Sequence, residues 1–404
     1  MTVSVALIVR NEERTLARCL ASLAGAADEL VVVDTGSTDA TKEIARRHTD
    51  RLFDFEWRDD FAAARQFAFD RATSDWVMWV DADDVVRGAE RLRPLASSAP
   101  DEVGGFSFLY DCARDRWGNP TCEFWRERLV RNDGSFRWEG RIHEVLVSKA
   151  GANVARSDEV VVEHRRDPAR GAEKSGRNLS ILEAEREAAE RAGRRPAPRL
   201  LFYLANEYAD AGEDECALAA YEDYLRVGTW DEELYVAQLR ISALHRRRGR
   251  YEQAINSDLR ALKLCPHWPG AYFGLAESYY HLRAWHKVIH WCDVGRAMPA
   301  PDAVLFVNPM AHRFDWLIYY TNALFHVGEV REALRWTRRA LELRPDDEWH
   351  RQNFIAFAGA LATEAGAGDA RERESASPVG GAAALAGQRA VAAAATPQTK
   401  ERRR

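Results

Sequence analysis

The sequence predicts an α/β domain followed by an all-α domain of helical repeats. Up to about residue 165, apolar strand-like runs alternate with helical patterns, as in an α/β domain with a mainly parallel sheet. After Pro196 the pattern is wholly helical and repeats itself about every 34 residues. We therefore expect a first domain over residues 1–195 and a repeat domain over 196–362. Residues 363–404, rich in Ala, Gly and Arg, are expected to be a disordered tail.

In the first domain, strand-like runs alternate with three helical patterns. Asn11 is the expected N-cap of the first helix and Gly25 its stop, Thr38 or Asp39 begins a second helix, and the third spans Phe61–Ala72. The strands are expected at Val3–Val9, Leu30–Val33, Leu52–Trp57, Trp76–Val80, Gly105–Tyr110, Phe124–Val130 and Val160–Val162.

The repeats carry the anchors of tetratricopeptide repeats (TPR), in which a turn glycine precedes a small residue that lets two helices approach closely. The turns at Gly212, Gly249 and Gly328 are followed five positions later by Ala217, Ala254 and Ala333, and Val288 takes that place in a looser repeat. Four repeats are expected, with an insertion at Pro299–Asp315 between the third and fourth. A generic helical bundle is the alternative.

Composition excludes several classes of protein. A net charge of -6 with 30% charged residues is ordinary for a soluble protein and unlike a nucleic-acid binder. The early apolar run Val3–Val9 is much shorter than the roughly 20 residues of a membrane-spanning helix, so we expect no membrane span and a cytoplasmic location. The six cysteines include no CxxC pair, which favours reduced thiols over a disulfide framework or a zinc site.

Two acidic clusters follow apolar strands. Asp34 to Asp39 comes after the second strand, and Asp81, Asp83 and Asp84 follow the fourth. Open α/β sheets bind ligands at the carboxyl ends of their strands, and hard divalent ions such as Mg²⁺ or Mn²⁺ take oxygen ligands and share them with phosphates. The alternative is a set of helix N-caps, where Asp is also favoured.

Five segments in this order resemble the family 2 glycosyltransferases of GT-A fold, in the branch with C-terminal TPR repeats that includes sublancin-type peptide S-glycosyltransferases. The resemblance covers about residues 1 to 360. Asp84 replaces the usual glutamate at the end of the family's DADE block, which leaves Asp81 and Asp83 intact. The matching segments are Asn11-Glu12-Glu13, Val31 to Asp39, Trp57 to Arg65, Asp75 to Asp84, and Gly140-Arg141-Ile142-His143-Glu144.

The resemblance implies a role for each matching residue. Asp34 would bind the base or ribose of a nucleotide, in a pocket also lined by Val9 and Glu12. Asp60 and Arg65 would close over the nucleotide. Asp83 would ligate the metal ion on the pyrophosphate, and Asp81 would contact the ribose or the metal shell.

An inverting transfer also needs a base that takes the acceptor's proton. Glu144 matches the family position that supplies it, and Glu139 is the reserve. His164 is expected to complete the metal shell, while His143 would do the same or orient Glu144. Three arginines beside Trp125 either line the sugar or pyrophosphate path or form the solvated face of a strand: Arg126, Arg128 and Arg131.

The resemblance therefore implies transfer of a hexose from a UDP-sugar to a hydroxyl or thiol of a peptide, protein or natural product. Three alternatives stay open: a glycosyltransferase for cell-envelope glycans or lipid-linked sugars, a nucleotidyltransferase, or a non-catalytic TPR scaffold. The repeats are expected to hold the acceptor. Alternatively they mediate a homodimer or buttress the first domain. If the repeats hold the acceptor, a chain ending near Arg195 should hydrolyse the donor but lose transfer.

Overall fold

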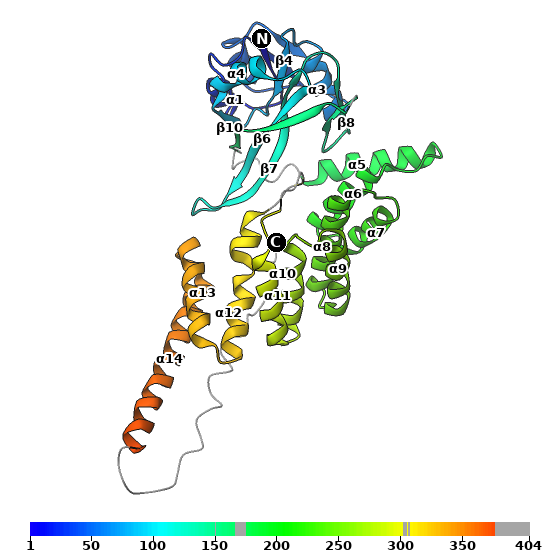
Figure 1. Ribbon diagram of the computed structural model, residues 1–404. Helices are drawn as coiled ribbons and strands as arrows, with labels where there is room; N and C mark the ends of the chain where they lie inside the picture. The colour runs from blue at the N-terminus through cyan, green and yellow to red at the C-terminus, as the bar shows by residue number, and fades with distance from the viewer. Residues whose placement is uncertain (150, 166–174, 302–304, 306–307, 376–404) are drawn as a thin grey trace.

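The chain divides into an α/β domain and an array of helices, as Figure 1 shows for the computed structural model. The structure describes residues 1–149, 151–165, 175–301, 305 and 308–375. The α/β domain lies at one end of the molecule, and two long strands, β6 (Val103–Arg114) and β7 (Pro120–Arg131), extend from it toward the helices. This arrangement agrees with the predicted fold class.

One eight-stranded sheet forms the centre of the α/β domain, in the order β3-β2-β1-β4-β7-β6-β10-β5. Strands β1 to β4 run parallel to one another, whereas β7 is antiparallel to both of its neighbours, β4 and β6. The parallel strands therefore end at one edge, where their loops meet. The remaining strands of this sheet are β1 (Val3–Val9), β2 (Glu29–Asp34), β3 (Leu52–Asp54), β4 (Trp76–Trp79), β5 (Asp84–Arg87) and β10 (Asn153–His164).

All seven predicted strands are present, but the sequence pattern missed three more elements of strand. These are β5 and the small hairpin of β8 (Phe136–Glu139) and β9 (Val145–Ser148), which forms a separate two-stranded sheet. Their runs are only four residues long, too short for a clear alternation. The helices of this domain are α1 (Leu16–Ser22), α2 (Thr41–Arg46), α3 (Phe61–Phe69) and α4 (Leu92–Ser98), with a 3₁₀ turn at Ala89–Arg91.

Asn11 is not the N-cap of α1, contrary to the sequence prediction. Helix α1 begins only at Leu16, and Asn11 adopts a left-handed φ of 54°. Its Oδ1 accepts a hydrogen bond from the Thr38 amide at 2.8 Å, and its amide donates to the Ser37 Oγ at 2.9 Å. Asn11 therefore ties the loop after β1 to the loop after β2.

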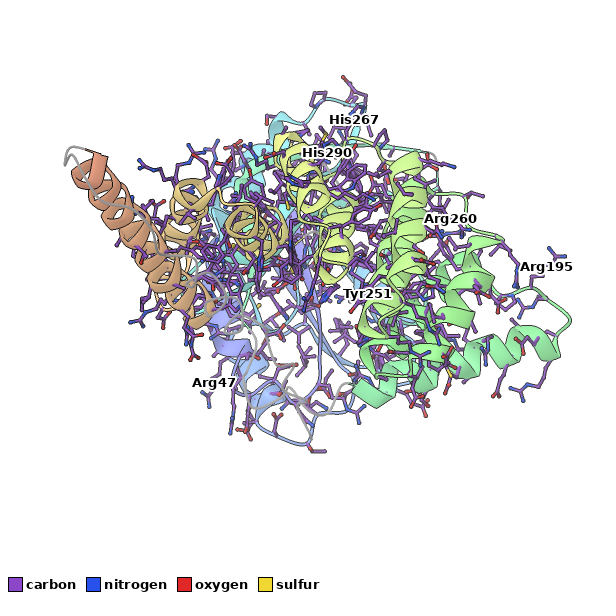
Figure 2. The ribbon with its side chains drawn as sticks, turned by 90° about the horizontal axis from the view of Figure 1, so that it is seen from below. Arg47, Arg195, Tyr251, Arg260, His267 and His290 are labelled. Carbon is purple, nitrogen blue, oxygen red and sulfur yellow. A yellow bond between two sulfur atoms is a disulfide. The ribbon has the colours of Figure 1, made fainter. Side chains whose placement is uncertain are left out.

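Four helix pairs follow one another in sequence order along the array. Figure 2 shows the molecule from below, with its side chains. The turn glycines Gly212, Gly249 and Gly328 have left-handed φ values of 82°, 69° and 88°, as predicted for repeat turns. In the third pair, Arg283 takes that conformation instead, with φ 55°. The pairs are α6 (Pro198–Asp210) with α7 (Asp214–Leu225), α8 (Asp231–Arg247) with α9 (Tyr251–Leu264), α10 (Gly270–His281) with α11 (Trp285–Ala297), and α12 (Leu317–His326) with α13 (Val330–Leu343).

The predicted small anchors of the repeats are all buried. Ala217, Ala254, Ala333 and Val288 are each 0% exposed, so every second helix packs closely on its partner. The array is flanked by α5 (Ser175–Arg191) before the first pair and α14 (Glu348–Ser375) after the last. Within the predicted insertion, Ala311–Asp315 form a π-helical turn.

Helix α14 continues beyond residue 363, where the disordered tail was expected to start. The rest of that predicted tail, residues 376–404, lies outside the described residues. No helix in the part of the chain that the structure describes is long and apolar enough to cross a membrane.

The tip of the β6–β7 hairpin contacts the far end of the array. Asp115 accepts a hydrogen bond from Arg344 Nε at 3.0 Å, and Asn119 donates to the Leu343 carbonyl at 2.8 Å. A second contact joins Trp117 Nε1 to Asp346 at 2.5 Å. The α/β domain therefore touches the array both at its start and near its end.

The expectation that all six cysteines are reduced is wrong for two of them. Cys112 on β6 and Cys122 on β7 form a disulfide, with their Cα atoms 5.2 Å apart. Ten positions separate the two cysteines, and the hairpin brings them face to face. A count of CxxC pairs has no way to detect partners joined by a long hairpin. Cys19, Cys216, Cys265 and Cys292 remain free.

Gly88 is a position where any side chain should destabilise the α/β domain. Its φ is 74°, and an added Cβ would lie 2.1 Å from the Glu159 carbonyl oxygen on β10. Gly25 has a similar φ of 72° but open space around it. We expect Gly88→Ala to lower the free energy of unfolding by about 3 kcal/mol and Gly25→Ala by about 1 kcal/mol. Thermal and urea unfolding of both variants measures the difference, and equal losses would contradict the steric argument.

Candidate active site

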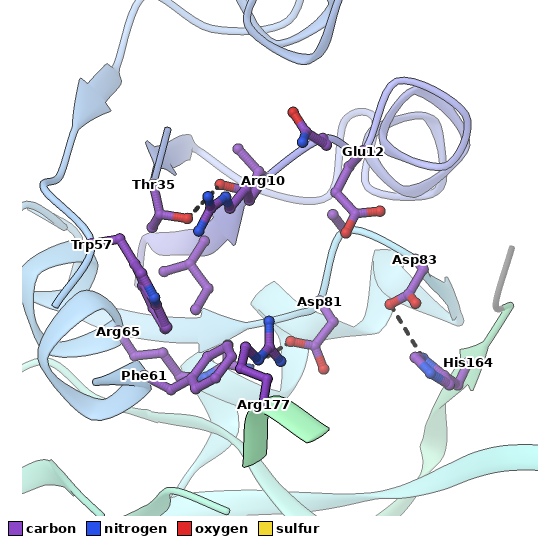
Figure 3. Close-up of a pocket in the computed structure, with 14 residues that line it drawn as sticks. Arg10, Glu12, Thr35, Trp57, Phe61, Arg65, Asp81, Asp83, His164 and Arg177 are labelled. Atoms are coloured by element: carbon purple, nitrogen blue, oxygen red, sulfur yellow. Dashed lines mark hydrogen bonds and ion pairs between the residues drawn. The ribbon is translucent and has the colours of Figure 1, made fainter. Parts of the chain in front are cut away.

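A cavity of about 510 Å³ opens at the carboxyl ends of the parallel strands (Figure 3). Predicted residues from four separate segments meet in it: Val9 and Glu12 at the end of β1 and just after it, Arg65 on α3, Asp81 and Asp83 after β4, and His164 at the end of β10. The remaining lining residues were not predicted and include Arg10, Thr35, Trp57, Phe61 and Arg177. We call this space the donor cavity.

Asp84 anchors the turn after β4. It is 0% exposed, and its Oδ2 accepts from the Asp81 amide at 3.0 Å and from Arg128 Nη1 at 3.2 Å. Its Oδ1 accepts from the Tyr110 hydroxyl at 3.2 Å and lies 3.1 Å from His164 Nδ1. One buried carboxylate thus fixes the turn that presents Asp81 and Asp83, together with the histidine that faces them.

Arg128 corrects the interpretation of the β7 arginines as a solvated strand face. It is 0% exposed, and its guanidinium lies over the rings of Trp79 at 3.7 Å and Tyr110 at 4.4 Å. Arg131 Nε donates a hydrogen bond to the Val103 carbonyl oxygen at 2.9 Å, and Arg131 does not line the cavity shown in Figure 3. The sequence pattern did not indicate that Arg128 is buried, because buried strand positions are usually apolar. Here the charge of Asp84 neutralises the buried guanidinium instead.

Asp83, Asp84 and His164 form a group whose ligand atoms all lie within 4.8 Å of one another. Asp83 Oδ1 lies 3.3 Å from His164 Nδ1. Asp81 is not part of this group, since its Oδ1 accepts from Arg65 Nη2 at 2.6 Å. The four hydrogen bonds to Asp84 leave Asp83 and His164 as the members best able to accept a new partner.

The pKa values of the two partly buried carboxyl groups in this turn, Asp81 and Asp83, are shifted in opposite directions. Burial raises the pKa of Asp83 to about 6, and the neighbouring Asp81, Asp84 and Glu12 add to the rise while His164 opposes it. Burial would also raise the pKa of Asp81, but the Arg65 and Arg128 guanidinium groups outweigh it and hold that pKa well below its usual range. The negative charge of Asp83 is therefore the one that lacks a sufficient counter-charge.

Asp34 and Asp60 lie behind the wall of the donor cavity. Asp34 is 1% exposed, and its Oδ2 accepts from the amides of Gly36 and Ser37, both at 3.0 Å. Among the described residues its buried Oδ1 has no hydrogen-bond partner, and Asp34 is not among the residues that line the donor cavity. Asp60 caps α3 by accepting from the Ala63 amide at 2.8 Å, and Phe61 and Arg65 of that helix reach the cavity instead.

A second cavity of about 270 Å³ adjoins the first and contains Glu144. The two cavities share Phe61, Arg65, Asp81 and Arg177. Arg65 donates from Nε to Glu144 Oε1 and from Nη2 to Asp81 Oδ1, both at 2.6 Å. The guanidinium therefore bridges the two spaces, and we call the second one the transfer cavity.

Glu139 lies outside both cavities. It ends β8 and forms an ion pair with Arg137, its neighbour on the same strand. Among the acidic residues predicted as the base, only Glu144 lines the transfer cavity within the described part of the chain.

Residues 4–148 match the family described as "Glycosyl transferase family 2". The α/β domain is a family 2 glycosyltransferase domain. The matched region includes every predicted residue of the donor and transfer cavities except His164.

Three relatives share part of the sequence. A TPR repeat-containing protein of Synechococcus elongatus is 49% identical over 147 residues, 36% of this chain and 35% of the relative. The lipopolysaccharide core biosynthesis glycosyltransferase LpsC of Rhizobium meliloti is 31% identical over 168 residues, covering 39% and 61%. The glycosyltransferase SunS of Bacillus subtilis is 30% identical over 148 residues, covering 35% and 34%. The chain thus matches between about a third and three fifths of these relatives' lengths.

Among solved structures, the helical part is similar to a fragment of MamA from Desulfovibrio magneticus. The TM-score is 0.35 at 14% sequence identity, over 45% of this chain and 90% of that one.

A third cavity, of about 390 Å³, lies between the glycosyltransferase domain and the first helix pairs. It shares Trp79, Arg126 and His143 with the transfer cavity, so the two spaces adjoin. One wall is β7 with Phe124 and Trp125, and the other is formed by α6 and α8. We call this space the interdomain cleft. Its further aromatic and apolar residues are Val145, Leu146, Phe202, Tyr203, Trp230, Val236 and Leu305.

Sequence reasoning missed Arg177 and the aromatic walls of these cavities. Arg177 lies on α5, with its guanidinium 5.2 Å from the Phe61 ring centroid, yet more than a hundred positions separate the two residues. Trp57 and Phe61 form an edge-on pair at 4.7 Å. Both belong to a segment that the family resemblance already singled out, so that segment was the available signal.

Removing the buried charge of Arg128 should lower the stability of the glycosyltransferase domain far more than removing an exposed charge. Arg128→Met leaves Asp84 buried without its counter-charge, for which we expect a loss of about 3–5 kcal/mol in the free energy of unfolding. Arg137→Met, which breaks the exposed pair with Glu139, should cost less than about 1 kcal/mol. Urea unfolding of both variants tests this. A small loss for Arg128→Met would show that the Asp84 contacts do not depend on that charge.

Proposed function

We propose that this chain is an inverting glycosyltransferase that moves a hexose from a UDP-sugar to a hydroxyl or thiol of a peptide, protein or natural-product acceptor. The main support for this proposal is the position of Arg65, which pairs with Asp81 in the donor cavity and with Glu144 in the transfer cavity. A nucleotide site and a candidate base thus share one rigid side chain. The family 2 match of residues 4–148 supports the reaction class.

The residues after β4 fit a divalent metal ion. Two carboxylates and an imidazole are ligands that Mg²⁺ or Mn²⁺ accept. Burial, with a contribution from the neighbouring carboxylates, raises the pKa of Asp83, and a bound cation would stabilise its ionised form. We assign Asp83 and His164 as ligands, with Asp84 orienting His164 through its 3.1 Å contact. Asp81 then acts through Arg65 rather than as a direct ligand. The bound ion would supply positive charge against the donor diphosphate.

The nucleotide would lie between the loops after β1 and β2. Val9 and Glu12 line the donor cavity there, and we assign the base or ribose to Asp34, which lies behind this wall and whose buried Oδ1 has no hydrogen-bond partner among the described residues. Trp57 and Phe61 provide aromatic surface on the opposite side. Asp60 contributes by capping α3, which carries Phe61 and Arg65.

In the transfer step the acceptor oxygen or sulfur attacks the anomeric carbon from the side opposite the diphosphate. The new glycosidic bond forms as the bond to the diphosphate oxygen breaks, and the nucleoside diphosphate leaves with that electron pair. Glu144 takes the acceptor's proton. Its position is fixed by Arg65 at Oε1 and by Arg126, which donates to the Glu144 carbonyl at 2.8 Å.

The interdomain cleft is the proposed acceptor site. Several charged side chains of the cleft already have ion-pair partners: Arg240 pairs with Asp210, which also lines the cleft, and Arg199 pairs with Glu233, which does not. Aromatic and apolar surface is therefore what remains for recognition, which suits apolar side chains of a peptide next to the modified residue.

A second candidate acceptor is a saccharide of the cell envelope. The similarity to a lipopolysaccharide core glycosyltransferase supports it, because the aromatic walls of the cleft could also stack on sugar rings. Supplying peptide and oligosaccharide acceptors to the same enzyme preparation distinguishes the two.

Loss of the Asp83 carboxylate should abolish metal-dependent nucleotide binding. We expect Asp83→Ala to bind UDP equally with and without Mn²⁺ and to lose turnover, because the diphosphate charge is no longer compensated. Calorimetric titration of UDP measures this. Asp158→Ala, on the exposed surface of β10, is the control and should retain the Mn²⁺ dependence. If the wild-type protein bound UDP with the same affinity with and without Mn²⁺, the metal assignment would be contradicted.

Replacing Glu144 should affect transfer but not donor binding. Glu144→Gln is expected to lower kcat on a hydroxyl acceptor by about 100-fold or more, while UDP affinity stays near wild type. A thiol acceptor, with an ordinary pKa of about 8.5, is partly ionised near neutrality and should suffer less. The comparison is Glu139→Gln. A larger loss in that variant than in Glu144→Gln would move the base to Glu139.

A further inference from the structure

The loop that carries Glu144 is held by both domains. It connects β8 to β9 and spans residues 140–144. The Arg141 carbonyl accepts from the Phe61 amide at 2.9 Å, which joins the loop to α3. Ile142 is 6% exposed and belongs to the apolar core formed by α5 and the first repeat helices, with Leu182, Leu201 and Leu204 among its members. The loop is therefore part of the helical packing as well as of the glycosyltransferase domain.

His143, the residue before Glu144, is contacted on three sides by helix α6. Its ring stacks on Tyr203 with centroids 4.0 Å apart and planes 12° from parallel. Its Nε2 lies 3.1 Å from Glu207 Oε1, and its carbonyl accepts from Arg199 Nη2 at 3.1 Å. Arg199 also donates to the Tyr203 hydroxyl at 3.1 Å, so the three α6 residues form one connected set.

The backbone of His143 explains why such support is needed. Its φ is 53°, a left-handed conformation that costs free energy for any residue with a Cβ. Strained residues of this kind persist where the surroundings over-determine them. Here ring stacking, a side-chain contact and a carbonyl hydrogen bond all come from α6, and the next residue along the chain is Glu144.

We propose that Tyr203 and Glu207 are positioning residues for the transfer reaction: by fixing His143 they place the Glu144 carboxylate. The proposal rests on the proposed function, since it assumes that Glu144 is the base. It assigns the first repeat helix a role in the chemical step, in addition to any contact with the acceptor.

Tyr203 and Glu207 also line the interdomain cleft, so an acceptor-binding role must be separated from positioning. Hydrolysis of the donor without acceptor achieves this, because water replaces the acceptor and the cleft is left unused. If Glu144 activates that water, its misplacement lowers hydrolysis as well. A residue that only contacts the acceptor leaves hydrolysis unchanged.

The experiment uses the full chain with Mn²⁺ and UDP-glucose, UDP-galactose or UDP-N-acetylglucosamine, whichever the wild type hydrolyses fastest. We expect Tyr203→Leu to lower kcat of hydrolysis by at least about tenfold, with KM for the UDP-sugar and UDP affinity within about twofold. Tyr203→Phe keeps the stacked ring and should retain most of the activity. Tyr272→Leu is the matched control, since Tyr272 is also half-buried on the first helix of a pair but contacts Pro266 instead.

A double-mutant cycle decides whether Tyr203 acts through Glu144. The variant with both Tyr203→Leu and Glu144→Gln should be no slower than Glu144→Gln alone, because a misplaced base and a missing base are equivalent. Glu207→Ala provides a second, smaller change and should lower kcat in the same direction if Tyr203→Leu does not fold.

Two results would overturn the proposal while leaving the proposed function intact: folded Tyr203→Leu and Glu207→Ala variants with wild-type hydrolysis, or losses that multiply with that of Glu144→Gln. A wild-type protein that hydrolyses none of the three donors would instead count against the proposed function itself.

Discussion

The buried ion pair between Asp84 and Arg128 is the constraint on which the candidate site depends. Both residues are fully buried, and the contacts of Asp84 reach Tyr110 on β6, Arg128 on β7 and His164 on β10. A charge pair at this depth costs desolvation, which only good geometry and further hydrogen bonds can offset. The gain is a fixed turn after β4, because Asp84 also accepts from the backbone amide of Asp81. The uncompensated charge of Asp83 is thereby held facing the donor cavity.

Arg65 extends this rigid centre toward the second domain. Its guanidinium joins Asp81 to Glu144 and lies over the Trp79 ring at 4.5 Å, so three sides of the group are occupied. Planar, always-charged guanidinium suits such a bridge better than a flexible ammonium would. The residue before Glu144, His143, in turn contacts Tyr203 and Glu207 of helix α6. Hydrogen bonds, a stacked ring pair and the peptide bond between His143 and Glu144 thus connect the donor cavity, the transfer cavity and the first repeat.

Much of this arrangement could be predicted from local sequence patterns. The apolar runs correctly predicted seven strands of the structure, and the turn glycines with their following alanines predicted the repeats. Both succeeded because hydrophobic period and backbone conformation are local properties of the sequence. The resemblance identified Asp83, Arg65 and Glu144, which meet around adjoining cavities. The roles given to them remain proposals.

What the sequence did not predict depends on partners far apart in the chain. The disulfide of Cys112 with Cys122 requires the register of a long hairpin, and the burial of Arg128 requires its pairing with Asp84. Asp60 is a different case, because its partner Ala63 is only three residues away, and an aspartate before a helix has the same sequence signature whether it caps the helix or binds a ligand. Local patterns carry no information on which of the two a carboxylate does.

The packing of Ile142 changes how the division of the chain at residue 195 should be understood. Ile142 lies in the glycosyltransferase domain by sequence, yet its side chain is buried in the core formed by α5, α6 and their neighbours. A chain ending near Arg195 would expose Ile142 and remove every α6 contact to His143. Loss of transfer in such a chain would therefore not distinguish acceptor binding from misplacement of Glu144, whereas single substitutions on α6 leave that core in place. By sequence the first repeat belongs to the repeat domain, but its helices also pack against the loop of the glycosyltransferase domain that carries Glu144.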